Sequence, residues 1–280
     1  MEKELRARVL LEALPYIREF SGKTVVIKYG GAALDDQASL RAQFAEDIVL
    51  LHYVGIKPVI IHGGGPRINS LLKMMGIQSQ FSGGVRVTDD ATMEAVEMVL
   101  SASINKEIVS LIQSKGGRAV GISGRDGNLA HAKKTKPELG RVGEVTPSDI
   151  DPAVIRTLLH GGYIPVIAPV ASDENRDSLN VNADTMAGAI ASALGAEKFV
   201  LLTDTPGVLS KGETVPRLSM DSARAMIQSG EISGGMIPKV QCCMSAFEQG
   251  VKQIHIVDGR VPHAIILEIF TRQGVGTMIQ

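Results

Sequence analysis

The chain has 280 residues, with 29 Lys and Arg against 30 Asp and Glu and a formal net charge of −1. This balance, with no basic stripe, argues against a nucleic-acid-binding protein. Apolar runs are shorter than the roughly 18 residues that cross a bilayer, and the first twenty residues carry too many charges for a signal peptide. The two cysteines, Cys242 and Cys243, are adjacent, which suits neither a disulfide nor a zinc motif. We therefore expect a cytoplasmic protein with no nucleic-acid or membrane partner.

The first twenty residues predict an amphipathic helix. Leu5, Val9, Leu10 and Leu14 recur at helical spacing and form an apolar stripe, and Pro15 is expected to kink or end the helix. We expect this arm to pair with the same arm of another subunit. Added to a dimer made by the rest of the chain, that contact closes a ring. A helix packed on its own subunit is the alternative.

From residue 21 onward, strand-like runs alternate with helical patterns. The predicted strands are TVVIK, KPVII, RAVGI, YIPVIAPV, KFVLLT and KQIHIV. The predicted helices are residues 38–53, 89–114, 183–194, 219–229 and 238–249, with two more after Pro66 and from Pro262. Such alternation predicts an α/β protein with a mostly parallel sheet between helices.

Polar segments predict how the chain is divided. Residues 124–149 are rich in short strands and turns, and they are expected to form hairpins on the first lobe. The polar break ASDENRDS ends at residue 178 and separates two halves of similar style. The predicted parts are an arm at 1–20, an N-terminal lobe at 21–178 and a C-terminal lobe at 179–280.

Two glycine-rich turns follow the first two predicted strands. Lys28 ends the first strand and precedes a Gly-Gly pair, and His62 ends the second strand and precedes three glycines. Ligands of open α/β sheets bind beyond the carboxyl ends of the strands, and bare backbone at a helix start lets an anion approach unpaired N–H groups. A plain tight turn is the alternative. Neither turn matches a Walker A or a dinucleotide motif, and His62 is interpreted as a packed or turn-capping residue and not as a base.

A third glycine-lysine element occurs in the second half, in SGGMIPKV. Gly234 and Gly235 precede a predicted helix, and Lys239 lies in its first turns. A single lysine is usually a solvated surface charge. One lysine beside a double glycine in each half is, however, what a two-lobed phosphoryl-transfer site needs, because such a site mainly positions groups and neutralises charge.

Polar residues in two further motifs are candidates for binding a substrate. Asn180, Asn182 and Asp184 alternate in LNVNAD, so they point the same way if the segment is extended. The two asparagines would then give amide groups to a polar substrate, and Asp184 would orient the lysines or a magnesium ion. An N-cap for the helix that follows is the alternative reading. In GGVRVTDD, Arg86 can bind a carboxylate with both prongs of its guanidinium, provided that this segment leans over the glycine turns. Otherwise it is a surface residue.

Together the motifs KYGGAAL, HGGGP, GGVRVTD, NVNAD, LLTDTPGVL and GGMIPKV, in this order, resemble the amino-acid kinase superfamily and, within it, the N-acetyl-L-glutamate kinases. The resemblance implies an open αβα sandwich that binds an acylated amino acid in the first lobe and ATP in the second. It also implies transfer of a phosphoryl group from ATP, with Mg²⁺, to the side-chain carboxylate of N-acetyl-L-glutamate, the second step of arginine biosynthesis. Because that carboxylate is ionised at neutral pH, no general base is needed.

The resemblance assigns roles residue by residue. The groups that stabilise the phosphoryl are Lys28, Lys239, Gly31 and Gly64, with Asp184 holding the two lysines. The acylglutamate contacts are Gly64, Gly65, Arg86, Asn180 and Asn182. The nucleotide contacts are Thr203, Asp204, Thr205, Gly207, Val208, Gly234, Met236 and Lys239, and no residue is expected to hold a metal, since Mg²⁺ is held mainly by the ATP phosphates. Ala32 stands where relatives often have a serine, so it receives no role.

The N-terminal extension implies regulation. The resemblance implies that relatives with such an arm form hexameric rings of three dimers and that L-arginine inhibits these enzymes. The arginine contacts expected here are Tyr16, Lys198, Glu268, Gly274 and Gly276, and a PII-type signalling protein is a further candidate partner. Two other functions are considered: a kinase of a related acid such as carrier-bound aminoadipate, and a non-catalytic sensor. The intact pattern of lysines and Asp184 speaks against the sensor.

Overall fold

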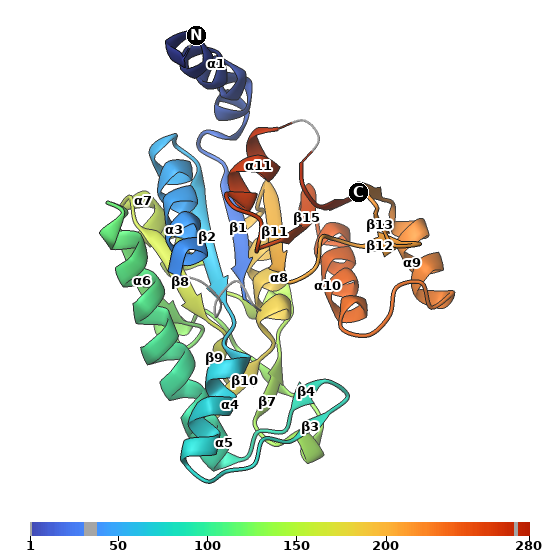
Figure 1. Cartoon of the computed structure of the whole chain (residues 1–280). Helices are drawn as coiled ribbons and strands as arrows, with labels where there is room; N and C mark the ends of the chain where they lie inside the picture. The colour runs from blue at the N-terminus through green and yellow to red at the C-terminus, as the bar shows by residue number, and fades with distance from the viewer. Residues whose placement is uncertain (1, 31–37, 272–273) are drawn as a thin grey trace.

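A computed structural model describes residues 2–30, 38–271 and 274–280, with the backbone alone for residues 2, 3, 5 and 6. Its central sheet lies between two layers of helices (Figure 1), so the predicted α/β sandwich is confirmed. Gly31 and Ala32 lie outside the described residues.

Eight strands form the central sheet. The strands, in sheet order, are β14 (Arg217–Leu218), β16 (Thr277–Ile279), β15 (Gln253–Asp258), β11 (Lys198–Thr203), β1 (Thr24–Tyr29), β2 (Lys57–His62), β8 (Ile164–Ala168) and β5 (Ala119–Ser123). Neighbours pair in parallel from β15 to β5, and β16 runs antiparallel to β15. The expectation of a mostly parallel sheet is therefore correct. Two short hairpins are separate from it: β3 (Phe81–Ser82) with β4 (Val85–Arg86), and β12 (Leu209–Ser210) with β13 (Glu213–Thr214).

Helices cover both faces of this sheet. On one face lie α3 (Ala38–Tyr53), α4 (Gly65–Met74), α5 (Asp90–Glu97), the π-helix η1 (Met98–Ile104), α6 (Asn105–Ser114) and α11 (Ala264–Phe270). On the other lie α7 (Ala153–His160), α8 (Ala183–Leu194), α9 (Met220–Gln228) and α10 (Met236–Glu248). Alternate residues of β1 pack into the two hydrophobic cores: Val25 and Ile27 into the first, and Val26 into the second. This is the period-two geometry of a strand that is buried on both faces.

A second, four-stranded sheet is separate from the central sheet. Its strands, in order, are β6 (Lys133–Lys134), β7 (Val142–Glu144), β10 (Ser178–Val181) and β9 (Val170–Ser172). The antiparallel pair of β6 and β7 confirms the predicted hairpin, and three short 3-10 turns surround it: η2 (Asp126–Asn128), η3 (Pro137–Leu139) and η4 (Pro147–Asp149). Strand β10 begins at residue 178 and pairs with both β9 and β7. The small sheet therefore extends past the proposed lobe boundary, which stays a prediction.

The N-terminal helix α1 (Glu2–Phe20) contains Pro15 in its interior. The prediction that the helix could end at Pro15 is wrong, because the helix continues to Phe20. A proline removes one backbone hydrogen bond, here the one to the carbonyl of Leu11. Leu11 is exposed, so water can solvate the carbonyl that loses its donor.

The apolar stripe of α1 is uncovered in the single chain. Val9, Leu10 and Leu14 are 55%, 72% and 46% exposed, and the side chain of Leu5 lies outside the description. The helix extends away from the body (Figure 1), and Tyr16 near its end packs against the first core. The alternative in which the stripe packs on its own subunit is therefore wrong.

Candidate functional site

A carboxylate and two lysines meet at the carboxyl end of the central sheet. The Nζ atom of Lys28 lies 2.9 Å from Oδ1 of Asp184, and the Nζ atom of Lys239 lies 3.0 Å from Oδ2. The three side chains come from β1, α8 and α10, which are far apart in sequence. The sequence pattern predicted this cluster, and the structure brings the residues together.

Local structure explains how each member is placed. Lys28 is the fifth residue of the buried strand β1 and is itself buried. Asp184 lies in the first turn of α8, where the side chain of Asn182 accepts hydrogen bonds from the N–H groups of Asp184 and Thr185. The N-cap reading of Asn182 is thus confirmed. Such a cap holds the start of a helix in place and stabilises it by about 1 kcal/mol.

The electrostatics of Asp184 follow from its two partners. Burial opposes ionisation of this carboxyl group, but the ammonium groups of Lys28 and Lys239 hold its pKa below the ordinary value. One negative charge thus faces two positive charges in a largely buried site. The excess of positive charge suits a phosphoryl group, which carries negative charge during transfer.

The second glycine turn packs tightly against the first core. The N–H of Gly63 donates to the carbonyl of Tyr29 at 2.8 Å, which ties this turn to the end of β1. A Cβ on Gly64 would lie 2.4 Å from Cδ1 of Ile104 and 2.7 Å from Cδ2 of Leu100. Position 64 therefore favours glycine, because a larger residue would have to displace the buried side chains of Leu100 and Ile104.

Arg86 leans over this glycine turn, as the substrate-binding reading required. It is 7% exposed, so its interpretation as a surface residue is wrong. Its guanidinium donates to the carbonyl of Gly65 at 3.3 Å and to Oγ of Ser79 at 3.1 Å, and it stacks over the ring of Phe81 at 4.7 Å. Asn180 lies in the neighbouring small sheet and donates to Oγ1 of Thr88.

The predicted nucleotide contacts fall into two groups. Thr203 ends β11, and its hydroxyl bonds with the backbone of Thr205 in the loop that follows, where Asp204 is exposed. Val208 is fully buried, its N–H donates to Thr277, and its carbonyl accepts from Val215. Val208 is therefore not brought to the surface of the site.

The remaining nucleotide candidates lie in the loop after β11 and at the start of α10. Gly207 needs to be glycine, since a Cβ there would lie 2.6 Å from Oγ1 of Thr277 and its φ is +133°. Gly234 has a left-handed φ of +55° and no atom within 4 Å of an added Cβ. Met236 begins α10 and packs partly against the second core.

The adjacent cysteines lie on α10 behind the lysine cluster. Burial raises the pKa of the Cys242 thiol to about 12, and its Sγ donates to the carbonyl of Asp184 at 3.0 Å. Cys243 is fully buried. Both are free thiols held in the protonated form, which indicates a packing role.

A separate cavity of about 840 Å³ lies between α1 and the C-terminal part of the chain. Its lining includes every residue that the resemblance named for arginine: Tyr16, Lys198, Glu268, Gly274 and Gly276. The structure thus brings these five residues to one cavity.

Glu268 is the buried anion of this cavity. Its Oε1 accepts from Nδ1 of His255 at 2.5 Å, and its Oε2 accepts from the N–H groups of Val275 and Gly276 at 2.7 and 3.1 Å. Burial opposes its ionisation, but these donors keep its pKa below the ordinary value. Lys198 is also buried here, with its Nζ 4.6 Å from the ring centroid of Phe20. The cavity therefore offers an anion and a cation together.

Two groups of residues in these sites were missed at the sequence level. His255 lies inside the apolar strand KQIHIV and gives no pattern of its own. Ser79 and Phe81 hold Arg86, but they lie in a segment without periodicity. A polar residue inside a buried strand was the one available signal, and it applied to His255.

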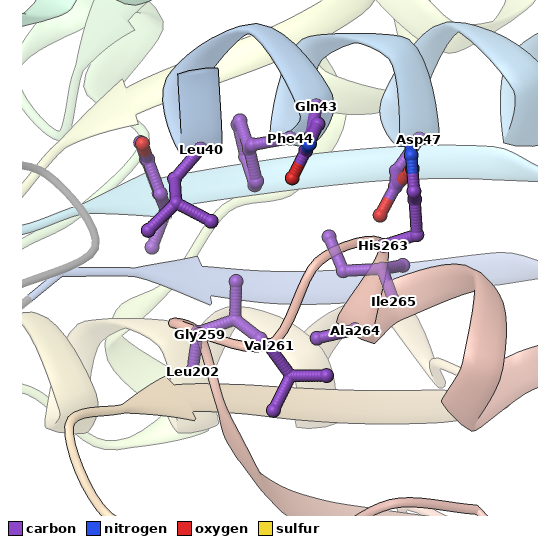
Figure 2. A pocket seen from close by; sticks show the side chains of 11 residues that line it. Leu40, Gln43, Phe44, Asp47, Leu202, Gly259, Val261, His263, Ala264 and Ile265 are labelled. Atoms are coloured by element: carbon purple, nitrogen blue, oxygen red, sulfur yellow. The ribbon is translucent and has the colours of Figure 1, made fainter. Parts of the chain in front are cut away.

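A smaller cavity of about 20 Å³ lies between α3 and the segment before α11. Figure 2 shows Asp47 of α3 facing His263, and the Nδ1 atom of His263 lies 2.7 Å from Oδ1 of Asp47. Burial raises the pKa of Asp47 to about 6. His263 has a left-handed φ of 56° just before α11, so the helix predicted from Pro262 begins two residues later.

In the described part of the chain, His, Cys, Asp and Glu form no cluster of three that could hold a metal ion. Among the described helices, none is long and apolar enough to cross a bilayer.

Comparisons with known proteins agree with this geometry. The amino acid kinase family matches residues 23–258. The chain is 56% identical to the acetylglutamate kinase of Leptospira biflexa, over 97% of this chain and 96% of the relative. It is 54% identical to that of Thermoanaerobacter pseudethanolicus, over 98% and 93%.

Among solved structures, the chain resembles N-acetylglutamate synthase from Neisseria gonorrhoeae complexed with coenzyme A and N-acetyl-glutamate. The TM-score is 0.86 at 25% identity, over 98% of this chain, which spans 63% of the length of the synthase. A structure of the same synthase complexed with coenzyme A and L-arginine gives a TM-score of 0.82 at 25% identity, over 98% of this chain and 65% of the synthase.

Proposed function

The chain belongs to the amino acid kinase family and, within it, to the acetylglutamate kinases (EC 2.7.2.8), and from this premise we propose how its residues act. The reaction transfers the terminal phosphoryl group of ATP to the side-chain carboxylate of N-acetylglutamate, within arginine biosynthesis. The product is N-acetyl-L-glutamyl 5-phosphate. The proposal concerns the role of each residue, the part of Mg²⁺, and control by arginine.

The single observation that carries the catalytic part is the cluster of Lys28, Asp184 and Lys239. The two ammonium groups bind the oxygens of the moving phosphoryl, and Asp184 keeps both lysines at the same point between the lobes. Because the carboxylate is ion-paired with both, it orients them without taking a proton. The N–H of Gly64 donates to the same phosphoryl. Such preorganised donors supply most of the rate enhancement in phosphoryl transfer.

The acceptor substrate lies over the glycine turn in this proposal. Arg86 is held 3.3 Å from the carbonyl of Gly65, so its guanidinium is positioned to bind the α-carboxylate of N-acetylglutamate. Asn180, Asn182 and the N–H of Gly65 bind its remaining polar groups. The γ-carboxylate then attacks phosphorus directly, because it is already ionised and needs no base.

Mg²⁺ fits this site as a companion of ATP. Asp184 already has an ion pair at each oxygen, so it has little capacity left for a metal. A metal carried on the ATP phosphates would neutralise part of their charge when bound. The residues from Thr203 to Gly207, with Gly234 and Met236, are proposed to contact the nucleotide.

The test of the activity is a substrate panel with ATP and Mg²⁺ in which hydroxylamine traps acyl phosphate as a hydroxamate. N-acetyl-L-glutamate should give product, whereas N-acetyl-L-aspartate, free L-glutamate and N-acetyl-aminoadipate should give little. Preference for the aminoadipate derivative would favour the related-acid kinase. A protein that binds ATP and acetylglutamate but forms no hydroxamate would be a sensor.

We also propose that L-arginine binds in the 840 Å³ cavity. Its guanidinium would pair with Glu268, and its α-carboxylate would pair with Lys198. Both side chains are buried and of opposite charge, which suits a ligand that carries both charges. The synthase structure with bound L-arginine adds support from a relative of the same fold.

In this proposal the arm α1 links the cavity to assembly. Tyr16 of α1 lines the cavity, and the exposed stripe with Val9, Leu10 and Leu14 is available for the same arm of another subunit. Three dimers joined in this way form a hexamer. Arginine can slow the kinase only by favouring one lobe arrangement, so it should change the KM or produce a sigmoidal response. A PII-type protein is kept as a predicted partner.

Deletion of residues 1–20 tests this regulatory part. The deleted protein should become a dimer in light scattering and lose inhibition by arginine. A truncated protein that stays hexameric and inhibited would rule it out.

A further inference from the structure

His62, the last residue of β2, is fully buried and bonded on both sides of its ring. Its Nδ1 lies 3.0 Å from the carbonyl oxygen of Gly63, and its Nε2 lies 3.3 Å from Nδ2 of Asn105. Asn105 is the first residue of α6 and is also fully buried. The two side chains connect the glycine turn to the long helix that covers the sheet.

The partners determine which way the Asn105 amide points. Lys106 can only donate, and its Nζ lies 3.1 Å from Oδ1 of Asn105. The amide nitrogen therefore faces the carbonyls of Val166 and Ile122, at 3.0 and 3.3 Å, and the ring of His62. Its two N–H groups are shared among these three acceptors.

The same logic determines the tautomer of His62. Nε2 faces an N–H donor, so it must be the accepting nitrogen of a neutral ring. Nδ1 faces a carbonyl oxygen, which can only accept, so Nδ1 carries the proton and donates to Gly63. Burial lowers the pKa of His62 to about 4, so this neutral form holds throughout the physiological range. The positive charge of Lys106 near the ring also lowers the pKa of His62.

The hydrogen bond to Gly63 controls the N–H group of the next residue. The carbonyl of Gly63 and the N–H of Gly64 belong to one peptide unit, which is planar and trans, so the two groups point in opposite directions. Within the described residues, the N–H of Gly64 has no hydrogen-bond acceptor. We infer that His62 is a positioning residue: by fixing the carbonyl of Gly63 toward the core, it aims the N–H of Gly64 at the transferring phosphoryl.

The surroundings are built to hold this arrangement. Glycine permits many backbone angles, so a turn of three glycines does not fix its own peptide planes. The side chains of Leu100 and Ile104 in η1 occupy the space that a Cβ on Gly64 would need, and π-helical turns often occur at functional sites. On β5, a Cβ on Gly121 would lie 1.8 Å from Oδ1 of Asn105. Asn105 therefore occupies space that the sheet leaves open for it.

This inference rests on the proposed role of the Gly64 N–H, and two substitutions of His62 test it. In His62→Asn, the side-chain amide can donate from nearly the position of Nδ1. In His62→Gln, the amide reaches toward Asn105, at the position of Nε2, and leaves the carbonyl of Gly63 without its donor. Both variants are neutral and polar, so their burial costs are similar.

We expect His62→Gln to lower kcat about tenfold, a part of the effect of losing one oxyanion donor, with the KM for ATP within about twofold. His62→Asn should recover most of that turnover. Thermal unfolding and circular dichroism establish that both variants are folded. Equal turnover of the two variants, high or low, would overturn the inference, because a packing role does not distinguish the two amide positions.

A readout independent of activity is the tautomer itself. Long-range ¹H–¹⁵N correlation spectra of the ¹⁵N-labelled enzyme should show, between pH 5.5 and 8, a histidine with protonated Nδ1 and bare Nε2 whose signals vanish in His62→Asn. Their loss in this variant distinguishes them from the signals of His255, whose Nδ1 also donates. An Nε2–H tautomer or a charged ring would contradict the inference. Failure of the proposed function would have a different result. Variants of Lys28 or Lys239 would then show normal turnover, whatever the turnover of His62→Asn and His62→Gln.

Discussion

Two largely buried carboxylates, Asp184 and Glu268, have different partners. Asp184 forms ion pairs with two lysines, Lys28 at 2.9 Å and Lys239 at 3.0 Å. Glu268 accepts hydrogen bonds from His255 and from the backbone N–H groups of Val275 and Gly276. The first site therefore presents excess positive charge, and the second presents a carboxylate with Lys198 nearby in an open cavity.

The difference shows that burial of an acid does not by itself identify its role. Both carboxyl groups are largely buried, and both have a pKa below the ordinary value because their partners outweigh the cost of burial. The partners decide what each site can bind. Two ammonium groups around one carboxylate suit a negatively charged phosphoryl, whereas backbone N–H donors leave the negative charge of Glu268 for a cationic ligand. The following predictions test this contrast.

The largest effect is expected from removing the negative charge of Asp184. Asp184→Asn should lower kcat on the order of a hundredfold, since the two lysines lose the group that gathers them. The matched Glu268→Gln variant should keep its turnover in the absence of arginine. Initial rates of hydroxamate formation check both, with thermal unfolding as the control for folding. Similar losses in the two variants would remove the distinction between the sites.

Arg86 should affect one substrate only. Arg86→Lys should raise the KM for N-acetylglutamate about tenfold or more and leave the KM for ATP nearly unchanged, because an ammonium cannot reproduce a two-pronged contact. Arg224→Lys, a change on the exposed helix α9, is the control. Equal changes in both KM values would mean that Arg86 acts through general packing.

Glu268 should set the response to arginine. Loss of a hydrogen bond to a charged partner costs about 1.5 to 3 kcal/mol, so Glu268→Gln should raise the arginine concentration for half inhibition at least about tenfold. The measurement is an arginine titration of the rate. An unchanged midpoint would exclude Glu268 as the partner of the guanidinium.

The smallest effect on catalysis is expected from substitution of Asp47. This residue should instead make the free energy of unfolding depend on pH. Its pKa of about 6 in the folded protein lies above the ordinary 3.8, so the folded state binds this proton more tightly. Its stabilising contribution is complete below pH 3.8 and is lost as the pH rises through 6.

The difference in unfolding free energy between the wild type and Asp47→Asn should therefore fall by on the order of 2 kcal/mol from pH 4 to pH 7. Urea unfolding at several pH values measures it, and exposed Asp221→Asn is the control. A difference that stays constant across this range would contradict the raised pKa.

Local patterns predicted much of the fold. Helices were expected at residues 38–53 and 183–194, and the structure has them with the same bounds. Periodicity and capping residues determine such elements within a short stretch of chain. Pro15 does not end the first helix, because a proline inside an exposed helix costs one hydrogen bond that water can replace. The expected kink stays a prediction.

Long-range contacts limited the prediction of the sites. The motifs identified Lys28, Asp184 and Lys239, but the ties of His62 to Asn105 and of Glu268 to His255 join residues 43 and 13 positions apart. Neither pair has a spacing signature, because the packing of elements brings its members together. The turn-capping interpretation of His62 was correct, whereas its partner could not be read from the sequence.

The most direct test of the central claim is the turnover of Lys28→Met and Lys239→Met beside Lys73→Met, a change at an exposed lysine of α4. The account predicts that each of the first two lowers kcat on the order of a hundredfold or more, with the fold intact and with Lys73→Met unchanged. Near-normal turnover in either of the first two variants would contradict the assignment of that lysine to the transferring phosphoryl.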